Sequence, residues 1–288
     1  MFHLELLTVG LIQGAMYAMM ALGLTLIYGL LRILHIAHAA LFTLGAYAGV
    51  LAANAGLGLL PAAIVAVAIG GIAGPLVYVA IYRPLLDKPP YVALIASIGL
   101  LIALEDGFRL VFGPYGLSFD NNPWFITGWM IGGIYLNAVQ AAIAVTAILS
   151  IAAFTWFARR TRAGVAWRAT VTDPAMARTF GVEPDRVRIM SFAIASMLAA
   201  VAGVLIGLLN NLVEPTMGSI IAYKGLAIIV LGGLGNVPGT LVAALLLGVA
   251  ESFGQTYLDQ VLDRDAIAFL VLIVVLMVRP QGLFGKAG

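Results

Sequence analysis

Residues 189–213 read IMSFAIASMLAAVAGVLIGLLNNLV, and this run decides the fold class because it contains no Asp, Glu, Lys or Arg. A helix needs roughly 20 apolar residues to cross the hydrocarbon core of a bilayer, so the run is long enough to span it. Three more charge-free runs cover 33–82, 121–158 and 225–250. Each of these four runs predicts one membrane-spanning helix or two.

The composition of the whole chain agrees with a membrane protein. Of the 288 residues, 62% are hydrophobic and 10% are charged, whereas soluble domains carry about 25% charged residues. The absence of cysteine excludes disulfides, thiol catalysis and thiolate metal sites. No Lys or Arg precedes the first apolar run, so we expect a permanent first span rather than a cleaved signal peptide. The net charge of +2 says little about function. No nucleic-acid partner is expected.

We predict an all-α, polytopic bundle of about eight hydrophobic segments, forming a single transmembrane domain over residues 1–288. The expected spans cover 6–29, 35–53, 60–82, 91–112, 136–158, 188–210 and 265–280. The apolar segment 222–253 differs because glycines interrupt it at 232–239. Each half is about 15 residues, short of a full crossing, which predicts a broken, re-entrant hairpin. Residues 22–47 are interrupted similarly, and paired interruptions in two halves of a chain often mark a transport path.

The positions of the basic residues predict the orientation in the membrane. Seven arginines lie between two expected spans: Arg159, Arg160, Arg162, Arg168, Arg178, Arg186 and Arg188. The positive-inside rule makes this segment cytoplasmic. Alternation then leaves only Arg109, Lys224 and Arg264 of the fifteen basic residues outside, with the N-terminus outside and the C-terminus inside.

The polar segment 159–187 is expected to contain a short cytoplasmic helix over 174–180. Asp173 suits the N-cap and Pro174 the first helical position, and Gly181 is a natural stop. Such a short helix is unstable alone. Its apolar side chains are Ala175, Met176, Ala177 and Phe180. Two interpretations are open: the helix packs on the ends of its own spans, or it docks into another protein.

Four groups of residues carry a resemblance to a known family. They are GLTLIYG (23–29) with Ala37-His38 and LGAY (44–47); the short helix after Asp173; PTMG (215–218) with Lys224, VLGGLGN (230–236) and Pro238-Gly239; and RPQGLFG (279–285). In this order they resemble the branched-chain amino acid permeases of bacterial ABC importers, over nearly the whole chain.

The resemblance implies a non-catalytic permease of the bacterial inner membrane that works by alternating access. Its expected partners are a second homologous permease subunit, two cytoplasmic ABC ATPase subunits that hold ATP and magnesium, and a periplasmic substrate-binding protein. This chain is expected to hold no cofactor and no metal. A P-loop has the form Gly-x-x-x-x-Gly-Lys-Ser/Thr, and the one Gly-Lys here, Gly285-Lys286, is followed by Ala287.

The resemblance and the local sequence together suggest two groups of functional residues. ATPase coupling is expected from Arg162, Arg168, Asp173, Pro174, Ala177 and Gly181. The substrate path is expected to be flanked by Tyr28, His35, His38, Gly232, Gly233, Gly235, Asn236 and Gly239. Glycines in the 232–239 turn allow close backbone approach, which suits either substrate contact or tight packing against the first span.

One departure leaves the substrate open. The family has Asn, two residues, His and then Gly where this chain has His35, His38 and Ala39. Branched-chain or related amino acids are the first expectation; urea, short amides or other small organic solutes are the alternative. An ATP-independent secondary transporter is a further alternative.

Several charged or ionisable residues also have two interpretations. His35 and His38 are three apart, as on one helix face, and either relay a proton, bind a metal or, as we favour, fix the break between the first two spans. Glu105 and Arg109 have the spacing of a helical ion pair, with contact to the binding protein as the alternative. For Glu214 and Lys224 we favour anchoring at the outer interface over contact with the substrate's charges, and for Glu251 a docking or anchoring role over substrate contact.

Overall fold

In the computed structural model, residues 2–258 and 263–285 are described, and most of them are helical. The longer helices are α1 (Phe2–Leu31), α2 (His38–Asn54), α3 (Leu59–Val77), α4 (Pro90–Phe112), α6 (Ala138–Arg160), α7 (Arg162–Thr172), α9 (Pro184–Asn210), α10 (Met217–Gly232), α11 (Val237–Leu258) and α12 (Arg264–Val278). The short elements are the π-helix η1 (Tyr78–Tyr82), the 3-10 helix η2 (Arg83–Leu85), α5 (Pro123–Ile126), α8 (Pro174–Thr179), and strands β1 (Gly128–Ile131) and β2 (Ile134–Asn137).

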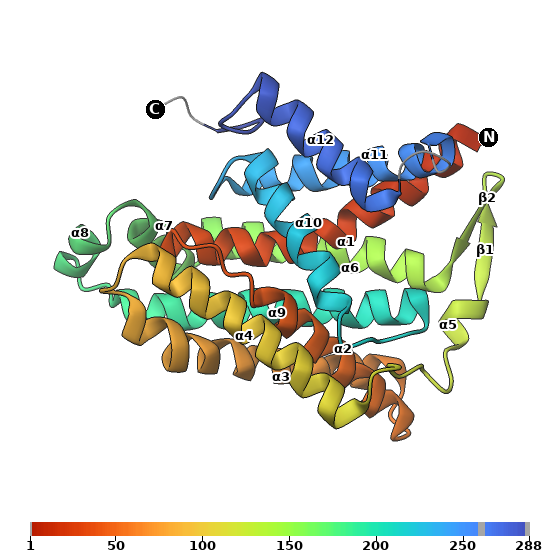
Figure 1. Ribbon diagram of the computed structural model, residues 1–288, viewed down its shortest axis with the longest axis horizontal. Helices are drawn as coiled ribbons and strands as arrows, with labels where there is room; N and C mark the ends of the chain where they lie inside the picture. The colour runs from red at the N-terminus through yellow and green to blue at the C-terminus, as the bar shows by residue number, and fades with distance from the viewer. Residues whose placement is uncertain (1, 259–262, 286–288) are drawn as a thin grey trace.

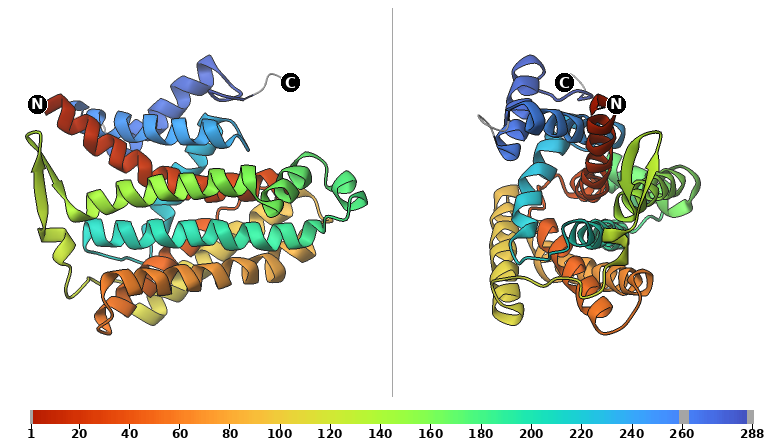
Figure 2. Two further views of the ribbon diagram at one scale, coloured as in Figure 1. Left: turned by 180° about the vertical axis from the view of Figure 1, so that it is seen from behind. Right: turned by 90° about the vertical axis from the view of Figure 1, so that its right-hand side faces the viewer.

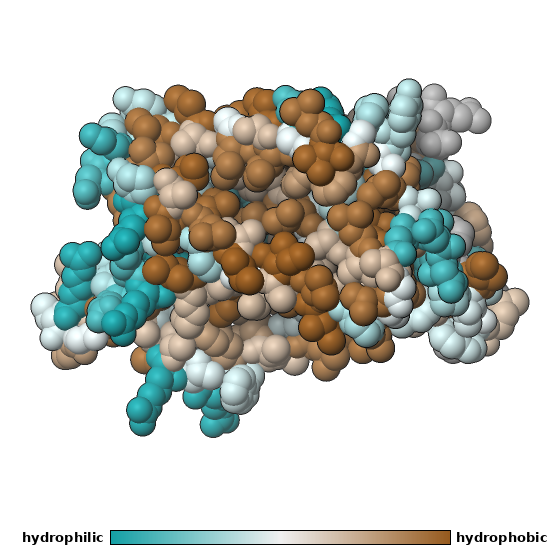
Figure 3. Space-filling model, turned by 90° about the horizontal axis from the view of Figure 1, so that it is seen from below, coloured by the Kyte–Doolittle hydropathy of each residue, from teal (hydrophilic) through white to brown (hydrophobic). Residues whose placement is uncertain are grey.

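Helix α1 runs through the middle of the bundle (Figures 1 and 2). Every residue from Met16 to Ile27 is buried, while α3, α4 and α6 bury only a narrow face and expose large apolar side chains. Exposed apolar helices are expected where the solvent is lipid. The face formed by α3 and α4 accordingly carries a broad apolar band with hydrophilic groups at its ends (Figure 3).

Six helices among the described residues are long and apolar enough to cross a membrane: α1, α3 with its extension to Leu85, α4, α6, α9 and α11. Helices α2, α10 and α12 have 17, 16 and 15 residues. The N-terminus and the β1–β2 hairpin lie at one end of the bundle, and α7 and α8 lie at the other (Figure 1). This arrangement separates the arginine-rich segment from the N-terminus along the axis of the helices.

Two expectations about the fold need correction. The chain is not wholly α-helical, because β1 and β2 pair antiparallel with Ile131 opposite Ile134. Gly132 and Gly133 both have positive φ, as the two-residue turn of a tight hairpin requires. The second half of the broken hairpin is also a full-length helix, since α11 continues through Leu258 and has 22 residues; only α10 has the length of a half-helix.

Candidate functional site

Two cavities open at opposite ends of α1, and a closed stretch of the same helix separates them. The cavity at the end that carries the N-terminus is about 370 Å³, and we call it the outer cavity and the other one the inner cavity after the orientation expected from the sequence. The outer cavity is lined by Val9, Ile12, Gln13, Met16, Tyr17, Gln140, Ile206, Leu209, Asn210, Ile220, Ile221, Lys224, Gln255 and Asp265. The inner cavity, about 710 Å³, is lined by Gly29, Arg32, Val171, Val230, residues 233–238, Pro280, Gln281, Phe284 and Gly285.

Between the cavities the bundle is closed by tight helix contacts. A Cβ on Gly225 of α10 would lie 2.8 Å from Leu24 Cδ1 on α1, and a Cβ on Gly23 would lie 2.6 Å from His38 Nε2. Leu24 is 3% exposed. The described residues therefore place two separate cavities along one helix, with tightly packed backbone between them.

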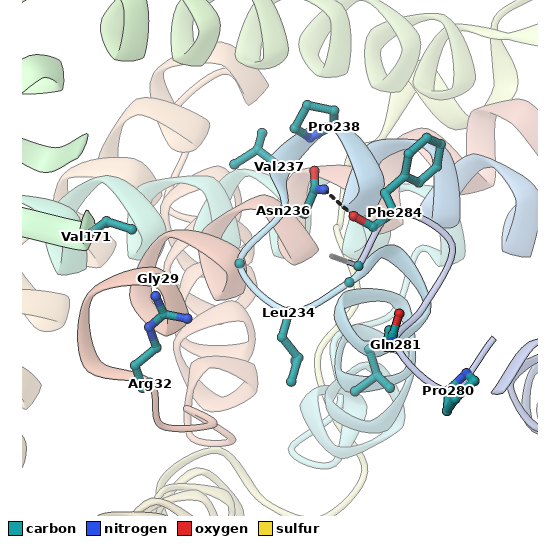
Figure 4. Close-up of a pocket in the computed structure, with 14 residues that line it drawn as sticks. Gly29, Arg32, Val171, Leu234, Asn236, Val237, Pro238, Pro280, Gln281 and Phe284 are labelled. Carbon is teal, nitrogen blue, oxygen red and sulfur yellow. Dashed lines mark hydrogen bonds between the residues drawn. The ribbon is translucent and has the colours of Figure 1, made fainter. Parts of the chain in front are cut away.

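The predicted glycine turn forms one wall of the inner cavity (Figure 4). Gly233 and Gly235 have φ of +96° and +79°, where glycine is favoured over side chains that carry a Cβ. Tyr28 lies beside Gly235, because a Cβ there would be 3.8 Å from Tyr28 Cδ1. Gly239 packs so closely that its Cβ would lie 2.0 Å from the carbonyl oxygen of Gly232.

The C-terminal motif folds back onto this turn, so that two of the sequence motifs meet. Leu283 N donates to the carbonyl of Leu231 at 2.7 Å. The side chain of Asn236 bridges both parts, because its Nδ2 donates to the carbonyl of Phe284 at 2.8 Å and its Oδ1 accepts from Gly239 N at 3.0 Å. We call residues 279–285 the C-terminal clasp. Lys286 lies outside the described residues.

Replacing Asn236 by Ala is expected to loosen the clasp, because both of its hydrogen bonds are lost at about 1 kcal/mol each. The expected result is faster deuterium exchange at the Leu283 amide, by roughly tenfold or more. Asn121→Ala, at an exposed asparagine near the opposite end, is the control. Unchanged exchange in the Asn236 variant would contradict this role.

The two histidines lie apart from both cavities. His35 precedes α2 and His38 begins it, so the prediction that they share one helix face is wrong. Both are buried, at 1% and 0% exposure, and His35 Nδ1 lies 2.6 Å from Tyr82 Oη of the π-helix. Ser97 Oγ accepts from the backbone N of Ala37 at 2.9 Å. Neither ring nitrogen of His38 has a hydrogen-bond partner among the described residues, so that the pair fixes the break between α1 and α2 stays a prediction.

Buried charge gathers at the wall of the outer cavity, where the sequence predicted only interfacial anchoring. Lys224 Nζ lies 3.0 Å from Glu251 Oε1 and 3.0 Å from Asp265 Oδ1. It also donates to Tyr17 Oη at 3.2 Å, and that hydroxyl donates to Glu251 Oε2 at 2.6 Å. The Lys224 and Glu251 side chains are 4% and 0% exposed. We call these four residues the ionic cluster; it joins α1, α10, α11 and α12.

The sequence contained a signal for this cluster. Lys224 and Glu251 are the only charged residues in α10 and α11, on either side of the glycine turn. Because an antiparallel hairpin brings such positions together, opposite charges in two apolar helices indicate a buried pair.

The predicted pair between Glu105 and Arg109 is wrong. Arg109 Nη1 instead lies 3.0 Å from Asp106 Oδ1, and Ser219 Oγ donates to Glu105.

The arginine-rich segment is anchored by α7. Thr161 caps this helix, because its Oγ1 accepts from Gly164 N at 2.9 Å. Trp167 is 7% exposed and meets Phe154 of α6 edge to face at 6.0 Å. Arg162 and Arg168 lie on the exposed side of the helix. Helix α7 therefore holds the segment against the bundle while it presents two cations to solvent.

Helix α8 has the predicted caps at both ends. Asp173 Oδ1 accepts from Ala175 N and Met176 N, each at 2.9 Å. At the other end, Gly181 has φ of +80°, and its N and that of Val182 donate to the carbonyls of Arg178 and Ala177, which is a Schellman motif.

The two faces of α8 differ. Ala177 is 3% exposed, so it does not offer the apolar surface that we predicted, but packs inward. Met176 and Phe180 are 55% and 81% exposed. One side of the helix thus packs on its own chain, as the first interpretation expected, and the other exposes an apolar tip. Docking of this tip into another protein stays a prediction.

Comparison with known proteins decides the family. Residues 6–278 match the profile of the branched-chain amino acid transport system / permease component family. The chain belongs to this permease family. The match covers all described helices apart from the first residues of α1, so the permease assignment applies to the bundle as a whole.

Individual relatives match the permease over nearly its full length. The high-affinity branched-chain amino acid transport system permease proteins LivH of Salmonella typhimurium and BraD of Pseudomonas aeruginosa are 33% and 32% identical, each over 99% of this chain and 96% of the relative. The autoinducer 2 import system permease protein LsrC of Yersinia pseudotuberculosis is 27% identical over 96% of this chain and 77% of its own. Among solved structures, PsaBC from Streptococcus pneumoniae in complex with Fab gives a TM-score of 0.48 at 12% identity, over 96% of this chain and 88% of that one, which is too distant to bear on the site.

Proposed function

We propose that this permease is the membrane-spanning subunit of an ATP-driven importer for branched-chain amino acids, in the bacterial inner membrane. Its partners are a second homologous permease subunit, two cytoplasmic ABC ATPase subunits that bind ATP and magnesium, and a periplasmic substrate-binding protein. The observation that carries the proposal is the full-length identity to the LivH and BraD permeases. The chain itself acts as a single, non-catalytic transmembrane domain over residues 1–288.

The proposed orientation has the N-terminus outside and the C-terminal clasp inside. The separation of the arginine-rich segment from the N-terminus along the bundle supports this, together with the positive-inside rule. In this orientation the outer cavity receives substrate from the binding protein, and the inner cavity releases it. The turn 232–239 and Tyr28 flank the release side, while His35 and His38 hold the break in the first pair of spans.

We propose that α8 transmits the ATPase movement to the bundle. Met176 and Phe180 fit an apolar recess on the ATPase subunit, and Arg162 and Arg168 supply cationic contacts beside it. Asp173, Pro174 and Gly181 define the two ends of the helix, and Ala177 holds its inner face. A short helix whose two ends are capped and whose one face is packed on the bundle can transmit a movement as a rigid unit.

The test is ATP-dependent uptake of labelled leucine into proteoliposomes that hold the permease, its partner subunits and the binding protein. ATP trapped inside is expected to drive uptake, and its omission to abolish it. Uptake that does not depend on ATP would refute the importer in favour of a secondary transporter. ATP hydrolysis without leucine uptake would indicate that the transported substrate belongs to another chemical class.

A second substrate class has a specific observation in its favour. The LsrC relative belongs by its name to an autoinducer 2 import system, and the first motif has His35 where the resembled family usually has Asn. Urea, short amides and other small organic solutes are therefore the substrates to screen next, in the same proteoliposomes and with the binding protein exchanged.

Phe180→Asp is expected to lower ATP-driven uptake by about tenfold or more, because a buried apolar contact on the ATPase would become a desolvated charge. Unfolding temperature should stay unchanged, since Phe180 is 81% exposed. Tyr115→Asp, at a side chain 90% exposed on the opposite end, is the matched control. Equal uptake by the two variants would show that Phe180 does not contact the ATPase subunit.

A further inference from the structure

A third cavity, of about 540 Å³, lies at the end of the bundle that carries α8 and is more basic than its surroundings. Its lining comes from the end of α1 and the segment after it, the η2–α4 connection, α8 and the start of α9: Leu30, Leu31, Ile33, Arg83, Leu86, Asp87, Lys88, Pro90, Arg178, Asp185 and Arg188. Four cationic side chains thus face two carboxylates. We call it the basic cavity.

Three of the four cationic side chains in this cavity form no ion pair within the described chain. Arg83 Nη2 lies 3.1 Å from Asp185 Oδ2, and the other carboxylate oxygen of Asp185 accepts a hydrogen bond from Tyr78. Lys88, Arg178 and Arg188 take part in no ion pair among residues 2–258 and 263–285. The Nε of Arg188 is buried and makes no hydrogen bond there. A buried donor of this kind indicates an acceptor from outside the chain.

The position of the cavity points to the kind of anion. Leu30, Leu31, Ile33 and Leu86 line it with apolar surface beside the cations. The adjoining first turns of α4 expose Tyr91 and Ile95 at 63% each. On this face the hydrophilic groups gather at the edge of the apolar band (Figure 3). The site therefore combines cations for a phosphate with apolar surface for acyl chains.

We propose that the basic cavity binds the phosphate headgroup of an anionic phospholipid, with Lys88, Arg178 and Arg188 on the phosphate and the acyl chains along α4. Basic pockets between membrane helices on the cytoplasmic side bind such headgroups. An arginine suits a phosphate because its guanidinium donates two parallel hydrogen bonds. The bound lipid would tie α8 to the start of α4 and α9, so the lipid would also stiffen the base of the arginine-rich segment.

The test is native mass spectrometry of the full-length permease in detergent, titrated with phosphatidylglycerol and, for comparison, with zwitterionic phosphatidylcholine. The variant K88Q/R178Q/R188Q is expected to bind phosphatidylglycerol at least about tenfold more weakly, since each basic residue near the surface contributes to attraction. The matched control R159Q/R160Q/R186Q removes the same charge outside the cavity and should stay within about twofold of the unchanged protein. Phosphatidylcholine should bind weakly to all three.

Three outcomes would overturn the proposal. An equal loss of phosphatidylglycerol binding in the control variant would show that the net charge alone attracts the lipid. If glycerol 3-phosphate binds as tightly as the lipid, the ligand of the cavity is a free phosphate ester and not a membrane lipid. Loss of the ATPase subunit from the purified complex, with lipid binding unchanged, would assign the cavity to an acidic segment of that subunit.

A fourth measurement keeps the proposal testable should the triple variant unfold. R178Q alone changes an exposed residue of α8 and is expected to weaken phosphatidylglycerol binding about threefold or more without altering the unfolding temperature. No weakening in R178Q, with the protein folded, would contradict the assignment of this arginine to the phosphate.

Discussion

Replacing Lys224 by Met is expected to lower the free energy of unfolding by about 3–5 kcal/mol, because the Glu251 carboxylate then loses its cation at a buried position. The Glu251 side chain is 0% exposed, and Lys224 is its cationic partner at 3.0 Å. Unfolding in mixed micelles of mild detergent and dodecyl sulfate would measure the loss. The same variant should yield less monodisperse protein on purification.

Two companion variants separate the ion pair from side-chain volume. In Lys224→Met with Glu251→Leu, both charges are removed, and most of the lost stability should return, since apolar residues often replace a buried pair at little cost. Glu183→Gln breaks the pair with Arg186, whose side chains are 61% and 80% exposed, and is expected to cost under about 1 kcal/mol. A double variant as unstable as the single one would show that the cluster's charges are not what destabilises it.

Replacing Gly248 by Val is expected to cost about 3 kcal/mol, because α11 and α1 cross with their backbones in contact at this residue. A Cβ on Gly248 would lie 2.3 Å from Gly14 N and 2.4 Å from the carbonyl oxygen of Gly10. Neither backbone atom can move aside without separating the helices. The measurement is again unfolding in mixed micelles, with uptake of leucine as a second readout.

Gly99→Val in α4 is the matched control for this crossing. A Cβ on Gly99 would meet nothing within 4 Å, so the change in stability is expected to stay within about 0.5 kcal/mol. If both valine variants lose the same stability, close contact at the crossing is not the cause of the loss, since helix propensity alone favours Val over Gly.

The helical bundle could be predicted from the sequence because membrane spans need only local information. Charge-free runs mark segments that avoid water, and caps such as Asp173 act within one turn. The β1–β2 hairpin was missed although Gly132-Gly133 stands between two apolar stretches, because so short a signal is lost in a Gly-rich chain. The length of α11 was underestimated because Glu251 and its polar neighbours resemble a helix end.

The candidate site could be predicted only in part, because its decisive contacts join residues far apart in the chain. The turn at 232–239 could be singled out by its glycines, and its residues 233–238 line a cavity. The charges of Lys224 and Glu251 indicated a buried pair, but the ionic cluster also joins Lys224 to Tyr17, 207 positions away, which no local pattern reveals. For the same reason, the sequence did not show that the histidines are buried against Tyr82 or that the C-terminal clasp meets the turn.

The clasp has a consequence for how the protein is made. Phe284 follows its partner Asn236 by 48 residues. Because ribosomes add about 5–20 residues per second, the clasp is synthesised roughly 2–10 s after the turn between α10 and α11. During that delay the carbonyl of Leu231 has not yet received the N–H of Leu283. The α10–α11 hairpin is therefore synthesised in full before the clasp residues that bond to its turn exist.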